Sequence, residues 1–128
     1  MSQPVILVAE DNDFVRMQIV TFLKSADFSV IEATDGKEAL AIIEKETVDM
    51  VIVDVRMEPM DGFSFMSSVR ANGLDMPFIM VTGDNSPDIL EKSGDWDVSA
   101  VLIKPVQKER LIKAVERCWA FIEKKGAL

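Results

Sequence analysis

Short apolar runs rich in β-branched residues recur five times along the chain, and an amphipathic stretch follows each of them. Runs of four or five such residues are typical of strands buried on both faces of a sheet, and the amphipathic stretches carry apolar residues at helical spacing. The predicted strands are Val5–Ala9, Val30–Ala33, Met50–Val53, Phe78–Val81 and Ala100–Ile103.

Helix-start signals support the predicted helices. Asp35 with Glu38 three positions later resembles a capping box, and Ser86 before Pro87 predicts an N-cap followed by proline at the first helical position. That fourth helix is expected to be short and to end near Lys92. The apolar faces of the other four helices are Val15, Ile19 and Phe22, then Ala39, Leu40 and Ile43, then Phe65, Met66 and Val69, and last Leu111, Val115, Cys118 and Ile122.

Strict alternation of strands and helices predicts the fold class. Parallel neighbouring strands need right-handed crossovers, which the intervening helices supply. We therefore expect an α/β three-layer sandwich, with helices on both faces of a parallel five-stranded sheet. A chain of 128 residues can form one domain with a substantial core but is too short for two ordinary domains, so residues 1–128 are expected to form a single domain.

The residue inventory excludes several classes of protein. With 22 acidic and 14 basic residues the formal charge is −8, which argues against direct binding to nucleic acid or to an anionic membrane. There is no histidine and only one cysteine, Cys118, so a histidine-based triad, a zinc cluster and an internal disulfide are excluded. No run is long enough for a signal peptide or a membrane span, so a cytoplasmic location is expected.

Polar side chains follow the carboxyl ends of four predicted strands: Glu10 and Asp11, then Asp54, Thr82 and Lys104. In open α/β sheets ligands bind at this edge. Three carboxylates held close together cannot all stay ionised without a cation, and their oxygen ligands suit Mg²⁺. Lys104 is redundant for a metal and implies a second anion, a phosphoryl group, which Asp54 could accept as an aspartyl phosphate.

Four segments at these positions carry a family resemblance: VAEDND, VDVRMEPMDG, MVTG and LIKP. No single segment is specific, but together, in this order and at these spacings, they resemble the response-regulator receiver domain of two-component signalling, also described as CheY-like. The resemblance covers nearly the whole chain. It implies a flavodoxin-like (βα)5 fold with strand order 2-1-3-4-5.

The resemblance also implies roles for individual residues. Asp54 would be phosphorylated by a partner histidine kinase or histidine phosphotransferase, which would supply the histidine that this chain lacks. Thr82 and Lys104 would contact the phosphoryl oxygens, and the Lys104–Pro105 peptide bond would be cis. The protein would catalyse only its own phosphorylation and dephosphorylation. A switched surface would then act on a downstream protein target, and dimers through the fourth and fifth elements occur in the family.

The implied metal ion is Mg²⁺, and the resemblance assigns its ligands. The side chains of Asp11 and Asp54 and the backbone carbonyl of Arg56 would bind the ion directly. Glu10 would reach it through a water molecule.

The chain departs from the family pattern near the predicted site. Glu58 replaces a proline four residues after the acceptor, so the loop is expected to take a different path and to modulate the site. Val101 replaces an aromatic residue. In the family, that aromatic side chain changes rotamer as the threonine moves and so couples it to an output surface, and this chain has no ring at that position. Arg56 and Asp84 are expected to flank the path of an attacking water and thereby to influence the lifetime of the phosphoryl group.

Other residues near the site are expected to have structural or docking roles. Asn12 and Asp13 are interpreted as caps of the first helix rather than ligands, and Asp61, before Gly62, as a turn or cap residue. Met57 and Met60 are candidates for a soft docking surface, and Trp96 for an exposed contact.

Three other functions use a similar fold or a similar aspartate. A haloacid-dehalogenase-like phosphatase needs a second carboxylate two residues after Asp54, where the chain has Arg56. A flavodoxin-type FMN carrier needs a hydroxyl- and glycine-rich phosphate loop, whereas the EDND segment would repel a phosphate. A pseudo-receiver that serves as an interaction module without phosphorylation remains open, although the complete set of site residues argues against it.

Overall fold

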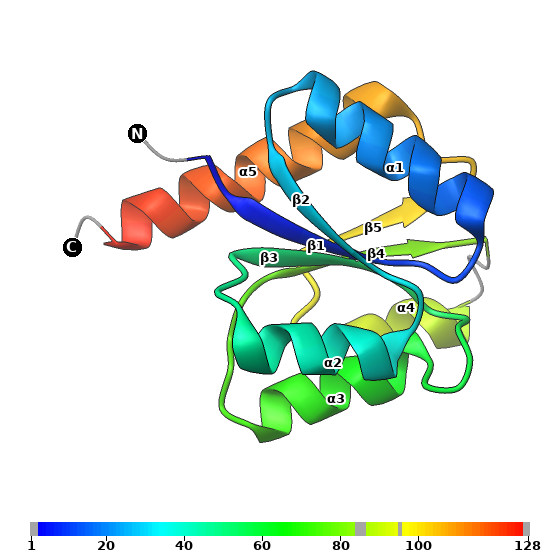
Figure 1. The fold of residues 1–128 in the computed structure, drawn as a ribbon. Helices are drawn as coiled ribbons and strands as arrows, with labels where there is room; N and C mark the ends of the chain where they lie inside the picture. The colour runs from blue at the N-terminus through cyan, green and yellow to red at the C-terminus, as the bar shows by residue number, and fades with distance from the viewer. Residues whose placement is uncertain (1–2, 84–86, 95, 127–128) are drawn as a thin grey trace.

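Strands and helices alternate along the whole chain in the computed structural model, which describes residues 3–83, 87–94 and 96–126 (Figure 1). The elements are β1 (Val5–Ala9), α1 (Asp13–Ser25), β2 (Ser29–Ala33), α2 (Gly36–Lys45), β3 (Met50–Asp54), α3 (Gly62–Ala71), β4 (Phe78–Thr82), α4 (Pro87–Gly94), β5 (Ala100–Ile103) and α5 (Lys108–Gly126).

The strands form one parallel sheet in the order β2-β1-β3-β4-β5, which confirms the predicted flavodoxin-like α/β topology. Helices α1 and α5 cover one face of the sheet, and α2, α3 and α4 cover the other, so the layers follow the expected sandwich (Figure 1). Among the described residues, no helix combines the length and the apolar character that a membrane span requires.

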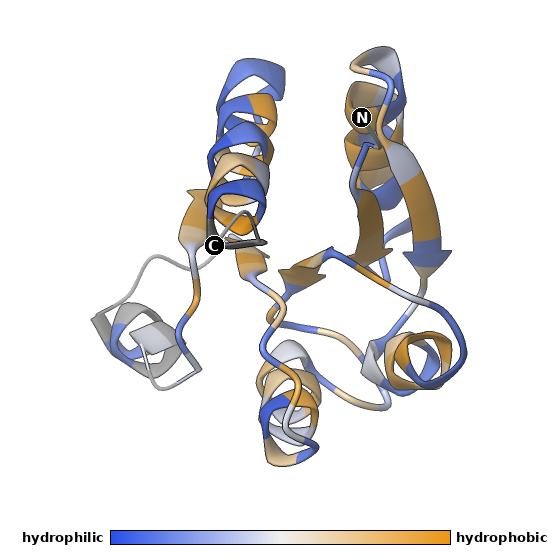
Figure 2. Ribbon diagram, turned by 90° about the vertical axis from the view of Figure 1, so that its left-hand side faces the viewer, coloured by the Kyte–Doolittle hydropathy of each residue, from blue (hydrophilic) through white to orange (hydrophobic). Residues whose placement is uncertain are grey.

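Alternate residues of each central strand enter different cores, as the period of a β-strand requires. Ile52 and Ile79 pack in the core beneath α1 and α5, whereas their neighbours Val51 and Met80 pack beneath α2 and α3. Every residue of β3 and β4 is buried, which explains why these strands read as continuous apolar runs (Figure 2). The strands that carry the predicted site are therefore the fully buried strands of the sheet.

Both central strands run one residue further than the sequence predicts. Asp54 is the last residue of β3 and Thr82 is the last residue of β4. Asp54 pairs with Val81, and Thr82 pairs with Ile103 on β5. The polar side chains thus occupy the ends of the sheet itself rather than flexible loops beyond it.

Three helices begin at side-chain caps that the sequence predicts. Asn12 caps α1 and accepts a hydrogen bond from Val15 N at 3.0 Å, and Asp61 caps α3 in the same way from Ser64 N at 2.8 Å. Asp35 caps α2 and accepts from the backbone nitrogen atoms of the second and third helical residues.

The predicted capping box of α2 is shifted by one residue. The Glu38 carboxylate accepts a hydrogen bond from Thr34 N at 3.2 Å instead of from Asp35 N. The fourth helix continues to Gly94, two residues beyond the predicted Lys92. Its predicted cap, Ser86, lies outside the described residues.

Two predicted surface features are wrong. Met57 is only 4% exposed and packs in the core beneath α2 and α3, with Met60 half-buried against it, so these methionines do not form a docking surface. Trp96 is half-buried in the same core, and its ring centroid lies 5.3 Å from that of Phe63 on α3. The apolar surface that these side chains would expose is instead covered by α3 and the loop before it.

Candidate functional site

Three carboxylates meet where β1 and β3 end side by side. Ala9 pairs with Val53, so the chain reaches Glu10 and Asp54 at the same edge of the sheet. Glu10 is 1% exposed and Asp54 is 5% exposed, whereas Asp11 is exposed to solvent. One carboxylate oxygen from each of the three residues lies within 4.8 Å of the others.

Lys104 brings a positive charge to these carboxylates from the end of β5. Its backbone nitrogen donates to Thr82 O at 2.9 Å, which extends the pairing of β4 with β5 by one residue. Its Nζ lies 3.2 Å from Asp54 Oδ2 and 2.8 Å from Glu10 Oε1. The contact with Glu10 is thus an ion pair to a carboxylate that is almost wholly buried.

Burial and mutual charge shift the pKa values of this cluster. Burial is the main cause that raises the pKa of Glu10 to about 7, and the neighbouring Asp54 adds to it while Lys104 opposes it. For Lys104, burial disfavours the charged form, but the contacts with Glu10 and Asp54 outweigh burial and raise the pKa of the ammonium. The site therefore holds more negative charge than one lysine neutralises.

The donor atoms of this cluster fit a hard divalent cation. Carboxylate oxygens are the ligands that Mg²⁺ prefers, and one or two of them with water complete its usual coordination in proteins. Asp11 presents an exposed carboxylate to the cluster, and the buried Glu10 carboxylate contributes an oxygen to the same group. The side chains of Glu10, Asp11 and Asp54 could hold the ion, whereas a role for the Arg56 carbonyl stays a prediction.

The loop after β3 contains two of the predicted modulators. Arg56 and Glu58 are exposed, and Arg56 N lies 3.4 Å from Asp54 Oδ1, a long hydrogen bond. The Glu58–Pro59 peptide bond is cis. Asp84, the predicted partner of Arg56, lies outside the described residues, so that pairing remains a prediction.

Thr82 is the last residue of β4, and Val101 lies within the neighbouring strand β5. Thr82 is 1% exposed at the carboxyl end of β4, next to the strand that ends at Asp54. The Lys104–Pro105 peptide bond is cis. Val101 pairs with Met80, is partly buried in the core beneath α2 and α3, and lines a hollow of about 220 Å³ beside Pro105.

Arg16 contacts the acidic cluster from α1, and sequence reasoning did not identify it. Its side chain is 13% exposed, and Nη1 donates to the backbone carbonyl of Glu10 at 2.8 Å. Its other nitrogen atoms reach the carboxylates of Asp13 and Glu32. The spacing of Asp13 and Arg16 on one helical face was an available signal, but nothing in the sequence shows a contact with a backbone carbonyl.

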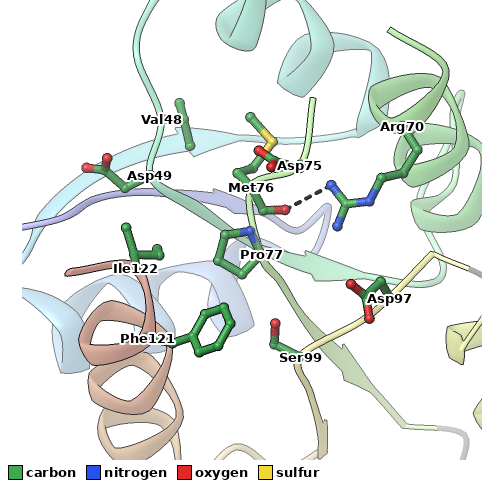
Figure 3. A pocket seen from close by; sticks show the side chains of 10 residues that line it. All are labelled: Val48, Asp49, Arg70, Asp75, Met76, Pro77, Asp97, Ser99, Phe121 and Ile122. Atoms are coloured by element: carbon green, nitrogen blue, oxygen red, sulfur yellow. Dashed lines mark hydrogen bonds between the residues drawn. The ribbon is translucent and has the colours of Figure 1, made fainter. Parts of the chain in front are cut away.

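A cavity of about 570 Å³ lies at the opposite edge of the sheet, and its lining includes Asp49, Asp75 and Asp97 but none of the three clustered carboxylates (Figure 3). Arg70 stands beside it, but its guanidinium donates to three backbone carbonyls, including Met76 O at 2.9 Å, and lies 4.0 Å from the Phe78 ring centroid. The hollow beside Asp11 and Arg56 is smaller, about 430 Å³. Of the three clustered carboxylates only Asp11 lines this hollow, so the hollow adjoins the cluster, where the chemistry is expected.

Comparisons with known proteins give a family match over most of the chain. The model of the response regulator receiver domain matches residues 6–116. The transcriptional regulatory protein PdtaR of Mycobacterium tuberculosis is 32% identical over 112 residues, which cover 87% of this chain and 54% of that protein. The chain thus spans about half the length of this relative.

Solved receiver structures are also similar to this chain. A CheY-like receiver domain protein from Methanospirillum hungatei JF-1 superposes with a TM-score of 0.90 at 25% identity, over 97% of this chain and 99% of that one. The chemotaxis response regulator CheY4 of Vibrio cholerae gives a TM-score of 0.84 at 31% identity, over 91% of this chain and 99% of that one.

Proposed function

Because this chain belongs to the family of response regulator receiver domains, which act in two-component signalling, we propose that it accepts a phosphoryl group on Asp54. The donor is a phosphohistidine on a partner histidine kinase or histidine phosphotransferase. Phosphorylation switches a surface that a downstream protein target recognises. Residues 1–128 serve as one receiver domain in this proposal, and the protein works in the cytoplasm, where its kinase partners present their phosphohistidine.

One observation supports this proposal above all others. Asp54 Oδ2 lies 3.2 Å from the Lys104 ammonium, and one carboxylate oxygen of Asp54 lies within 4.8 Å of an oxygen of Glu10 and of Asp11, although Asp54 and Lys104 are far from these two residues in the sequence. A nucleophilic carboxylate, a cluster of cation ligands and a fixed positive charge are the groups that phosphoryl transfer to an aspartate requires.

The chain's own residues supply the following steps. An Asp54 carboxylate oxygen attacks the phosphorus, a P–O bond forms, and the P–N bond to the donor imidazole breaks with its electron pair passing to the nitrogen. Lys104 neutralises charge on the phosphoryl oxygens, and the Thr82 hydroxyl donates a hydrogen bond to one of them. Lys104 thereby exchanges its contact with the free carboxylate for one with the phosphoryl group.

A magnesium ion held by Asp11 and Asp54, with Glu10 acting through water, would stabilise the negative charge that develops on the transferred group. Burial of Glu10 keeps its carboxylate directed at the cluster rather than at bulk water. Arg56 and Glu58, both exposed beside the acceptor, influence the access of water to the acyl phosphate and hence its lifetime.

The test is direct phosphorylation by a small molecule. The protein is incubated with MgCl₂ and a small acyl-phosphate donor, and its intact mass is measured. We expect the parent protein to gain the mass of one phosphoryl group. No mass should be gained when magnesium is chelated before the donor is added. Asp54→Asn is expected to abolish the adduct.

Asp75→Asn provides the matched control, because Asp75 is an exposed aspartate at the opposite edge of the sheet. It should be phosphorylated like the parent. A parent protein that gains no phosphoryl group, from the acyl phosphate or from a phosphohistidine donor, would contradict the proposal and would favour a pseudo-receiver that binds partners without phosphorylation.

A further inference from the structure

Arg16 ties three elements together beneath the acidic cluster. It lies in the second turn of α1, and its guanidinium donates to Glu10 O after β1 and to Glu32 Oε1 on β2. The distances are 2.8 Å to Glu10 O, 3.2 Å to Glu32 Oε1 and 2.6 Å to Asp13 Oδ1. One planar group thus connects the first two strands with the helix that follows the candidate metal ligands.

The contact with Glu10 O matters because that carbonyl belongs to the peptide unit between the two acidic residues. Glu10 N donates to Ala33 O at 3.1 Å, and Arg16 holds the carbonyl on the other side of the residue. The orientation of this peptide unit determines the direction in which Asp11 leaves the backbone. The Asp11 carboxylate is exposed and lies within the acidic cluster, so its direction from the backbone bears on the arrangement of the three carboxylates.

We propose that Arg16 is a positioning residue for the cation site, which fixes the Glu10–Asp11 peptide so that both carboxylates face Asp54. This inference rests on the proposed function, because it assumes that the cluster binds Mg²⁺. Arg16 does not touch the ion or the phosphoryl group. It acts through one backbone carbonyl.

The planar guanidinium of arginine suits this role better than the ammonium of a lysine would. Three acceptors lie in different directions around it, and only a planar group with several N–H donors reaches all of them at once. Hydrogen bonding with Asp13 is the main cause that raises the pKa of Arg16, so the group stays charged. Asp13 and Glu32 are largely exposed, at 84% and 47% of their side chains, so these two pairs alone add little stability.

Electrostatics and positioning predict opposite results when the positive charge is removed. A cation near a magnesium site repels the ion, so loss of Arg16 through charge alone would tighten magnesium binding. Loss of the support for the Glu10–Asp11 peptide would weaken it instead, as is usual when a group that orients metal ligands is removed. The sign of the change therefore separates the two explanations.

The experiment is a calorimetric titration of MgCl₂ into the parent protein and into Arg16→Met, without any phosphoryl donor. We expect the Kd for Mg²⁺ to rise roughly tenfold in Arg16→Met, in line with the loss seen when ligand-orienting groups are removed. Arg117→Met, which removes an exposed arginine from α5, is expected to bind like the parent. With saturating magnesium, Arg16→Met should be phosphorylated by an acyl phosphate at close to the parent rate.

Arg16→Lys keeps the positive charge but removes the planar set of N–H donors, so it separates the two contributions. It is also the second variant if circular dichroism shows that Arg16→Met folds poorly. We expect lysine to leave most of the affinity loss in place, whereas full recovery would overturn the positioning role. An unchanged or tighter Kd in Arg16→Met would also overturn it and would leave the proposed function intact. A parent protein that binds no magnesium would overturn the magnesium dependence of the proposed function together with this inference.

Discussion

Lys104 stands between the two most deeply buried carboxylates of the site. Its Nζ contacts both Glu10 and Asp54, and its own side chain is only 25% exposed. A buried carboxylate without a positive partner is costly, so the ammonium stabilises this arrangement before any cation arrives. The same charge repels a divalent ion that binds to those carboxylates. Under the proposed function, Lys104 is therefore expected to favour the phosphorylated state at the expense of metal affinity.

Substitution of Lys104 by methionine should separate these two effects. We expect Lys104→Met to bind Mg²⁺ more tightly, by roughly an order of magnitude, since one like charge close to the ion costs about 1 kcal/mol or more. Phosphorylation by an acyl phosphate should nevertheless become much slower, because the incoming phosphoryl oxygens lose a positive partner. Titration calorimetry gives the affinity, and intact mass against time gives the rate.

Lys113→Met is the control for this prediction, since Lys113 is an exposed lysine on α5. It should leave both quantities unchanged. Weaker magnesium binding in Lys104→Met would show that the lysine supports the shape of the site more than it opposes the ion.

At the scale of elements, the close approach of α3 to the end of β3 holds the acceptor in place. Gly62 is the first residue of α3, and its backbone nitrogen donates to Val55 O at 2.9 Å. A Cβ atom at this position would collide with the Asp54 carbonyl and would lie 3.0 Å from Val55 Cα. The contact is between backbone segments, so neither side can yield by rotating a side chain.

Gly62→Ala is therefore expected to destabilise the protein. Forcing a methyl group into a packed contact costs about 1–3 kcal/mol, and here the strain acts on the backbone of the acceptor residue. Urea unfolding followed by circular dichroism measures the loss. Gly94→Ala is the matched control, because a Cβ there meets nothing within 4 Å, and alanine is expected to be neutral or slightly stabilising. Equal stabilities of the two variants would contradict this account.

The strands and the site were predictable because each depends on a short local pattern. Burial on both faces makes β3 a continuous apolar run, and the parallel topology then brings the residues after each strand to one edge. This reasoning places Glu10, Asp11, Asp54 and Lys104 together, as the structure does. It needs no knowledge of side-chain contacts.

The features that the sequence did not predict are contacts between side chains or loops that are far apart or irregularly spaced in the sequence. Met57 follows the acceptor in a loop that looks exposed, yet the loop turns its side chain into a core. Trp96 likewise packs on Phe63, a partner that lies 33 positions away and follows no periodic pattern. Arg16 acts through a backbone carbonyl, which carries no sequence signal. Long-range contacts of single side chains were therefore the limit of prediction.

At the scale of the whole molecule, folding gathers negative charge at one edge of the sheet. Residues 10, 11 and 54 are separated in the unfolded chain, but their carboxylate oxygens lie within 4.8 Å of one another in the fold. Their mutual repulsion opposes folding, and the overall charge of −8 adds to it. A cation that binds this cluster binds the native state only, because the unfolded chain has no such cluster.

Magnesium should therefore stabilise the whole protein by mass action. At ten times its Kd, a ligand that binds only the native state adds about 1.4 kcal/mol to the free energy of unfolding. For a domain of this size that corresponds to a rise in Tm of roughly 4–6 °C, measurable by thermal denaturation followed by circular dichroism. A chelator should reverse the rise, and Asp11→Asn should reduce it.

The control is NaCl at the same ionic strength, which screens the net charge without occupying a site. If NaCl reproduces the full stabilisation, the effect comes from general screening, and the prediction fails. If magnesium alone stabilises the parent and loses its effect in Asp11→Asn, the carboxylates whose repulsion opposes folding are the same groups that bind the cation. Holding the three carboxylates together then lowers the free energy of unfolding, and the bound metal raises it again.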